Sequence, residues 1–355
     1  MAGEDVLRKL LADIFHWTRG GAPPAAQVIA AALGFAGPIA LAAALGQLPL
    51  GMAAAIGALA LSRGGEGATH AQRALGMAGS AVFGAAAIAA GTTIAQLGGI
   101  ALFLVPALAA VAALVGGINR PLGLIAAQFI LFTIIGTGIG NAGARPIALA
   151  VLFLLGATWT AGLSLALQRI LPRPVAPQEK PAASRQRTLA DQLRRWRQSL
   201  GHWAGWQYPA RITSCLAAAA GVALLLPTHH AYWVSLTVAI VVRRQMSEAM
   251  TRTVERALGT VAGVLAAMLL LLWSPPLPVL IALVAALAAA RPVLRVANYA
   301  AYAALMTPLI MLLLDLGRTP SLAIMLDRLL ATVIGCALSL TLGYWVWPRV
   351  QARAG

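Results

Sequence analysis

Twelve apolar segments run through this 355-residue chain, and most of them are long enough to cross a lipid bilayer. A membrane-spanning helix needs about 20 mainly apolar residues. Only 10% of the residues are charged, against about 25% in an average soluble domain. We therefore predict an all-α, polytopic membrane protein of about 12 transmembrane helices. The predicted spans are 26–46, 48–62, 74–95, 97–117, 121–141, 146–168, 210–227, 230–243, 256–273, 277–290, 298–315 and 326–347.

The positive charges are distributed as in membrane proteins. The formal net charge is +16, which in a soluble protein would indicate a nucleic-acid partner. Here the charges lie at the ends of the apolar segments and in one central linker, so we expect no nucleic-acid binding. If successive connections alternate between the two sides of the membrane, 23 of the 26 Lys and Arg fall on one side, and only Arg145, Arg318 and Arg328 on the other. The positive-inside rule then puts both termini and the linker in the cytoplasm, at the bacterial cytoplasmic membrane.

The chain contains an internal repeat. The sequence Arg-Ala-Leu-Gly at Arg73 recurs at Arg256, 183 residues later, and Arg328 follows Arg145 by the same 183 residues. Two landmarks at one offset predict two six-helix repeats. Because each has an even number of spans, the repeats have the same orientation and are related by an axis along the membrane normal. The unusually short spans at 48–62 and 230–243 occupy matching places, which in transporters points to the binding region; the alternative is a pair of tilted helices.

The repeat divides the chain into five predicted parts. They are an N-terminal amphipathic segment at 1–25, the first repeat at 26–168, a cytoplasmic linker at 169–209, the second repeat at 210–348 and a tail at 349–355. In the linker, Leu189, Leu193, Trp196, Leu200 and Trp203 follow one another at helical spacing, with arginines around them. Such a basic amphipathic helix fits the membrane interface, where arginines reach anionic headgroups; a regulatory docking role is the alternative. Residues 1–20 do not resemble a signal peptide.

Four arginines are candidates for binding an anion. Arg73 and Arg256 stand at the cytoplasmic ends of matching spans, and Arg145 and Arg328 are cations on the otherwise cation-poor outer side. The guanidinium group matches the geometry of a carboxylate. The alternative is that these side chains reach the headgroups or, for Arg256, pair with Glu255 or Glu248.

Proton coupling would require a titratable group near the pathway. The candidates are His70, Glu255, Asp315 and Asp327, all near membrane edges, where each could equally be a solvated end-group. Cys215 and Cys336 lie in apolar stretches, so we predict that they are small, buried apolar residues. No metal-ligand spacing and no hydrolase or phosphate-binding motif is present, so we expect no enzyme, no metal and no cofactor.

Part of the chain resembles a known family. The residues that carry the resemblance are Tyr232-Trp233-x-x-Leu236-Thr237, the tract Arg252-x-x-x-Arg256-x-x-Gly259-Thr260-x-x-Gly263, and Asp327-Arg328-Leu329-x-x-Thr332-x-x-Gly335. From about residue 211 to 348 they resemble the fusaric acid resistance protein-like family. That resemblance implies a relative of aromatic acid exporters and, more distantly, of plant aluminium-activated malate transporters. It would make Arg256 and Arg328, with Arg73 and Arg145, residues of the anion path. Many relatives also carry a large cytoplasmic domain, which is missing from the short linker here.

These features lead to three hypotheses. The first is an inner-membrane secondary transporter that exports small organic anions, aromatic carboxylates above all. The second is a passive organic-anion channel, and the third is a membrane scaffold whose basic helices recruit partners or lipids. The expected partners are the anion and the anionic lipid headgroups, and a periplasmic adaptor or a second copy of the chain is compatible with the sequence.

Overall fold

The computed structural model describes residues 17–18, 23–61, 70–141, 143–171, 188–225, 232–244, 249–273, 275–315 and 322–347. The regular elements in these ranges are all helices, which confirms the predicted all-α class for this part of the chain. The helices of the first half are α2 (Ala25–Ala44), α3 (Leu48–Ala60), α4 (His70–Ala95), α5 (Ala101–Val115) after the 3-10 turn η1 (Gly98–Ile100), α6 (Arg120–Gly140) and α7 (Pro146–Ile170).

The later helices follow a separate amphipathic helix, α8 (Leu189–Leu200). They are α9 (Trp203–Leu225), α10 (Tyr232–Val241), α11 (Ala249–Leu272), α12 (Leu277–Ala297), α13 (Tyr299–Asp315) and α14 (Leu322–Leu340), which ends in the π-helical turn η2 (Thr341–Trp345). Among the described residues, nine helices are long and apolar enough to cross a membrane, and α3, α10 and α13 are shorter apolar helices. The chain is therefore a multi-pass membrane protein.

Several helices extend beyond the predicted spans. α9 begins at Trp203, within the predicted linker, α11 begins at Ala249, and α12 continues to Ala297 instead of ending at residue 290. In the sequence, charged residues near the ends of these helices suggested loops, whereas in the structure the backbone remains helical through those residues. Most of the predicted N-terminal amphipathic segment and the whole predicted tail lie outside the described residues.

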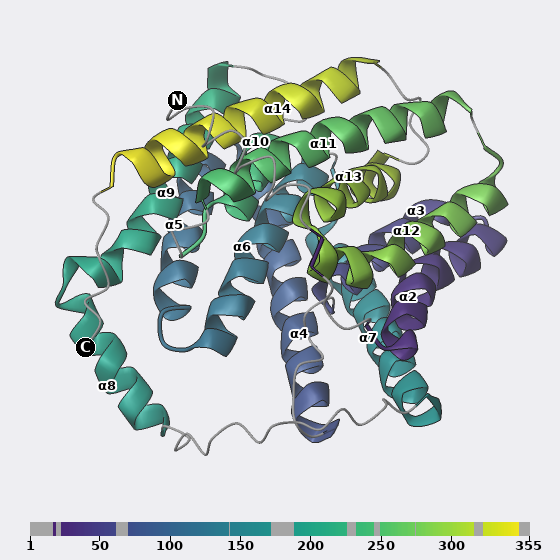
Figure 1. Cartoon of the computed structure of the whole chain (residues 1–355), viewed down its shortest axis with the longest axis horizontal. Coiled ribbons are helices and arrows are strands. Elements are labelled where there is room, and N and C mark those ends of the chain that lie inside the picture. Colours follow the sequence, from purple (N-terminus) through teal and green to yellow (C-terminus); the bar gives the residue numbers. More distant parts are fainter. Residues whose placement is uncertain are drawn as a thin grey trace.

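Helix contacts in the two halves correspond pair by pair. α4 packs against α6 as α11 packs against α13, α3 meets α7 as α10 meets α14, and α2 meets α3 as α9 meets α10. The contacts between the halves also correspond, since α5 lies on α9 and α12 lies on α2. Figure 1 shows the later helices α11 and α14 running side by side across the top of the view, with α4 and α6 below them.

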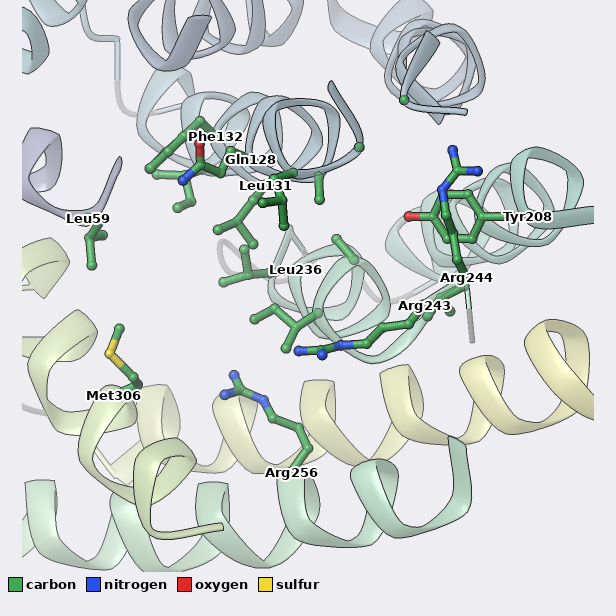
Figure 2. A pocket seen from close by; sticks show the side chains of 18 of the residues that line it. Leu59, Gln128, Leu131, Phe132, Tyr208, Leu236, Arg243, Arg244, Arg256 and Met306 are labelled. Carbon is green, nitrogen blue, oxygen red and sulfur yellow. The ribbon is translucent and has the colours of Figure 1, made fainter. Parts of the chain in front are cut away.

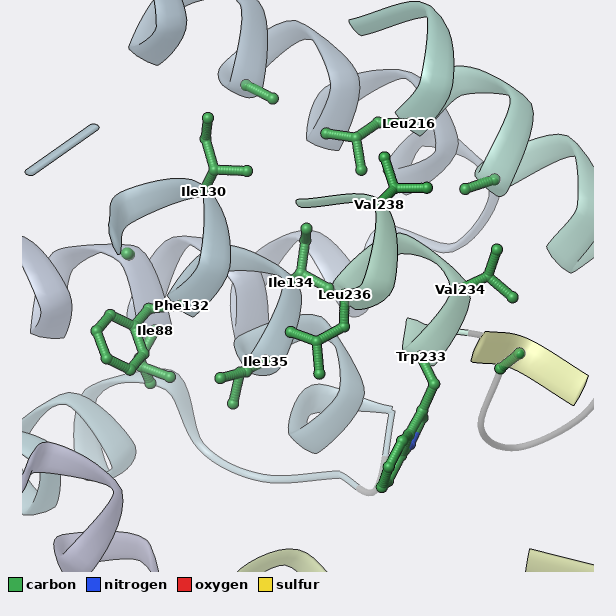
Figure 3. Packing of buried hydrophobic residues seen from close by; sticks show 14 of the residues in the cluster. Ile88, Ile130, Phe132, Ile134, Ile135, Leu216, Trp233, Val234, Leu236 and Val238 are labelled. Carbon is green, nitrogen blue, oxygen red and sulfur yellow. The ribbon is translucent and has the colours of Figure 1, made fainter. Parts of the chain in front are cut away.

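The main apolar core joins the two halves. Figure 3 shows Ile134 and Ile135 of α6 beside Leu236 of α10, with Leu216 of α9 nearby. Trp233, at the start of α10, is buried in the same cluster. Burial of such side chains stabilises the fold by about 1.5–3 kcal/mol each in water; within lipid, close packing takes over that role. The short helix α10 is thus surrounded by α6, α9, α11 and α14.

Candidate functional site

A cavity of about 580 Å³ lies between α6 and the helices of the second half. Its walls come from the first part of α6, the last part of α10, and α11, α12 and α13, with Tyr208 of α9 and Leu59 of α3 at its sides. This volume falls in the range of about 300–1,000 Å³ typical of small-molecule sites. Because Arg120, Arg243 and Tyr299 stand at helix ends on the same side, the cavity lies toward that end of the bundle.

The walls of the cavity carry many positive charges. None of the described residues that line it is acidic, and its polar side chains also include Asn119, Gln128 and tyrosine hydroxyls. The lining arginines are Arg120, Arg243, Arg244, Arg256 and Arg291. Figure 2 shows the side chains of Arg243 and Arg256 pointing toward one another across part of this space. An arrangement of this kind favours an anionic occupant.

Two of these arginines are almost fully buried. Arg256 is 3% exposed and Arg291 is 4% exposed. Nε of Arg256 and Nη1 of Arg291 have no hydrogen-bond partner in the described part of the chain. Arg291 reaches across to the first half, where its guanidinium lies 4.9 Å from the ring centre of Phe35 and Nη2 donates a long hydrogen bond of 3.5 Å to the carbonyl oxygen of Ala58. Both guanidinium groups therefore keep hydrogen-bonding capacity inside the protein.

The other lining arginines are held by aromatic rings and backbone. The guanidinium of Arg244 lies 4.8 Å from the ring centre of Tyr208 and donates a hydrogen bond of 2.6 Å to the carbonyl oxygen of Ala113. Burial lowers the pKa of Arg244 from its usual value. That usual value is so far above neutrality that the side chain stays charged at physiological pH. The guanidinium of Arg243 lies 5.9 Å from the ring centre of Tyr299.

Glycines bring α11 and α13 together beside the cavity. A Cβ atom added at Gly259 or Gly263 of α11 would overlap the carbonyl oxygen of Ala300 or Ala304 of α13. This close approach holds the base of Arg256, on α11, near Tyr299 and Tyr302 on α13, which also line the cavity. The glycine spacing noted in the sequence therefore acts through helix packing.

The four predicted anion-binding arginines are not brought together. Arg256 lines the cavity, whereas Arg73 is half-buried on α4 and donates a hydrogen bond of 3.2 Å to Gln168. Arg145 is exposed at the start of α7. Arg328 of α14 is 1% exposed, with its guanidinium 3.2 Å from the ring centre of Trp233. Arg73, Arg145 and Arg328 are thus not among the residues that line the cavity.

The predicted coupling residues lie away from the cavity wall where the structure describes them. Glu255 is buried beside Arg252, 3.9 Å from its guanidinium, and Asp327 is half-buried next to Arg328. Neither is among the lining residues. The side chains of His70 and Asp315 lie outside the described part of the chain. Within the described residues no cluster of His, Cys, Asp and Glu could hold a metal ion.

Sequence reasoning missed four of the five lining arginines. Arg120, Arg243 and Arg244 look like ordinary positive charges at cytoplasmic span ends, and Arg291 looked like the end of a span. One signal was available: Arg291 and Pro292 follow an apolar run without a loop-forming residue, so a helix could have been extended through them. The convergence of α6 with α10–α13 has no signature in any local window of sequence.

Comparison with known proteins gives one match. Residues 216–342 match a family described as fusaric acid resistance protein-like. The matched range runs from α9 to the π-helical turn after α14, so the chain is similar to this family over most of its second half. No curated protein and no solved structure matches the chain. The matched range contains four of the five lining arginines, all but Arg120.

Proposed function

We propose that this protein is a secondary transporter that exports small organic anions, aromatic carboxylates above all, across the bacterial cytoplasmic membrane. The observation that carries the proposal is the pair of buried arginines, Arg256 and Arg291, on one cavity whose described lining residues include no acid. Isolated charges in a low-dielectric interior cost several kcal/mol each unless they are paired. An anion in the cavity offsets that cost.

The walls also fit the rest of such a substrate. A guanidinium group binds a carboxylate through two parallel hydrogen bonds, and the side chains of Arg256 and Arg243 point toward one another across part of the cavity (Figure 2). Phe132, Leu131 and Leu236 supply apolar surface opposite them. One charged end and one apolar wall suit an acid with an aromatic ring.

The proposed direction of transport depends on which side of the membrane the cavity faces. Its mouth residues, Arg120 and Arg243, belong to the ends of the helices that the positive-inside rule places in the cytoplasm. Toward the other end, Phe132, Ile135 and Leu236 of its wall belong to the main apolar core, which also contains Trp233, the ring against which the guanidinium of Arg328 packs. A substrate taken up from the cytoplasm and released beyond this core is exported.

The architecture proposed for this task is a pair of parallel six-helix repeats. The matching contacts α4–α6 and α11–α13, α3–α7 and α10–α14, and α5–α9 and α12–α2 support a twofold relation between them. In transporters built from two repeats, the substrate lies near their interface. The cavity here is bounded by α6 and α3 on one side and by α10–α13 on the other.

A passive organic-anion channel is the second candidate. It is favoured by one observation: no described residue lining the cavity is a carboxylate or a histidine that could carry a coupling proton. In the transporter, Glu255, Asp327, His70 and Asp315 remain the proposed proton carriers.

The test is flux of labelled benzoate in proteoliposomes, with and without an imposed pH gradient. Arg256→Gln removes one charge-assisted hydrogen bond and should lower flux about tenfold or more, while its repeat mate Arg73→Gln, which alters a side chain away from the cavity, should retain flux. Uphill movement that needs the gradient identifies the transporter, and equilibration independent of the gradient identifies the channel. Equal flux in the Arg256→Gln and native proteins, both intact by size-exclusion chromatography, would refute the assigned site.

A further inference from the structure

The helix α8 has an amphipathic surface that the described bundle does not cover. Leu189, Leu193 and the arginines Arg194, Arg195 and Arg197 are all exposed. The one acidic residue of the helix, Asp191, is already engaged, because Thr188 caps the helix through the backbone N–H of Asp191 and bonds its carboxylate at 2.8 Å. The exposed surface thus combines apolar side chains with positive charge, as helices at a membrane surface do.

The neighbouring part of α9 shows where the membrane surface lies. Trp203 and Trp206 are exposed at the start of α9. This helix follows α8 directly along the chain (Figure 1). Tryptophan gathers at the level of lipid headgroups. Nε1 of Trp206 donates a hydrogen bond of 2.8 Å to the carbonyl oxygen of Leu200, which fixes the bend between the two helices. α8 therefore leaves the bundle at headgroup level.

α8 is also tied to the mouth of the cavity. Nε1 of Trp196 donates a hydrogen bond of 3.0 Å to the carbonyl oxygen of Leu114, at the end of α5, and the amide of Asn119 donates one of 2.8 Å to Gln192. The indole of Trp196 packs so closely on Gly117 that an added Cβ would lie 3.2 Å from its ring. Gly116, Gly117, Asn119 and Arg120 line the cavity. The turn between α5 and α6 thus contacts α8 and also lines the cavity.

We infer that α8 docks on anionic phospholipid headgroups and that this docking controls access to the cavity through the α5–α6 turn. The three exposed arginines bind the lipid phosphates, and Leu189 and Leu193 enter the interface. Trp196 and Gln192 transmit the position of the helix to Gly117 and Asn119. The inference takes its site from the proposed function, but the link between lipid and cavity mouth holds whatever solute the cavity binds.

The experiment measures access to the cavity and requires no transport. Ala127→Cys places a thiol on the α6 wall of the cavity, and both native cysteines are buried. The protein is reconstituted in nanodiscs of pure phosphatidylcholine or of phosphatidylcholine with phosphatidylglycerol. The rate of labelling by a neutral maleimide is compared, since an uncharged reagent is not repelled by the anionic surface. Asn141→Cys, exposed at the opposite end of α6, is the matched control.

We expect Ala127→Cys to label about fivefold faster in the anionic nanodiscs, the factor that one hydrogen bond of typical net strength is worth. The difference should disappear when Arg194, Arg195 and Arg197 are all changed to Gln. It should also disappear with Trp196→Phe, which keeps an aromatic ring and removes only the donor to Leu114. Asn141→Cys should label equally in both lipids.

Equal labelling of Ala127→Cys in the two lipids, or a difference that survives the triple Arg→Gln change, would overturn the inference. Results that refute the proposed function can be distinguished from these. If only the proposed function is wrong, benzoate flux is absent, while the labelling difference and its loss in Trp196→Phe remain. If the lipid dependence requires a second protein rather than phosphatidylglycerol, purified nanodiscs show no difference, and the inference is likewise overturned.

Discussion

The two halves of the molecule use the same helix pair in opposite ways. In the first half, α4 and α6 approach most closely toward their C-terminal ends, where a Cβ at Gly91 would overlap the carbonyl oxygen of Thr133 and one at Gly136 that of Ile88. In the second half, the closest approach joins the middle of α11, at Gly259 and Gly263, to the N-terminal part of α13, at Ala300 and Ala304. The face of α6 that lines the cavity lies in its N-terminal part, between Arg120 and Ile135.

The repeat-related arginines differ in the same sense. Arg73 and Arg145 of the first half are half-buried and exposed, whereas Arg256 and Arg328 of the second half are 3% and 1% exposed. Gly76, the mate of Gly259, faces open space. The same short motif therefore supports a packed and charged site in one copy and a plain helix surface in the other. The comparison teaches that a duplicated motif can mark a candidate site, but that it does not show which of the two copies contributes to that site.

The largest expected effect tests whether α11 is packed more tightly than α4, by adding side chains at glycines of the two helices. Gly263→Val should destabilise the protein by about 3 kcal/mol, because its branched side chain overlaps the backbone of α13. Gly76→Val, which has open space, should change the stability by less than about 0.5 kcal/mol. Thermal unfolding in detergent, followed by circular dichroism, measures both. Equal losses would mean that the α11–α13 contact is no tighter than the surface of α4.

The next effect concerns the repeat-related pair Arg145 and Arg328. Arg328→Gln removes a desolvated cation from the ring of Trp233 and should lower the stability by about 2 kcal/mol. Arg145→Gln, at an exposed position, should stay within about 0.5 kcal/mol. The same unfolding measurement compares the two, and a loss in Arg145→Gln as large as that in Arg328→Gln would contradict the difference in burial.

The smallest expected effect is stabilisation by a bound ligand, and it tests the difference between Arg73 and Arg256. Benzoate at ten times its dissociation constant should stabilise the native protein by about 1.4 kcal/mol, through binding to the folded state alone. Arg73→Gln should show the same increase in stability and unfolding temperature. Arg256→Gln should show about 0.4 kcal/mol or less, because tenfold weaker binding brings the same benzoate concentration down to one dissociation constant. A full increase in Arg256→Gln would place the anion elsewhere.

The positions of the helices could be predicted from the sequence because apolar length is a local property. The short lengths of the helices at 48–62 and 230–243 were predicted as well, and α3 and α10 are short. The ends were less accurate wherever a charge lies inside a helix. Arg291 is the clearest case, because its environment comes from Phe35 and Ala58 of the other half, far away in sequence.

The candidate site could be predicted only in part. Arg256 stood out because the repeat marked it, and it lines the cavity. In the sequence, Arg120, Arg243 and Arg244 look like the arginines that the positive-inside rule predicts at the cytoplasmic ends of any membrane spans. Only the packing of α6 on α10 separates the charges that face a cavity from those that face lipid headgroups or solvent, and that packing depends on contacts between the halves.

The set of five arginines around one cavity has a consequence for the empty protein in a cell. Positive charges held at close quarters repel one another and attract whatever anions are abundant. In the proposed exporter, chloride and phosphate of the cytoplasm compete with the organic anion for this cavity. The affinity for that anion would then be a difference between two occupied states, and selectivity would come from the apolar wall of Phe132 and Leu236, which inorganic ions cannot use.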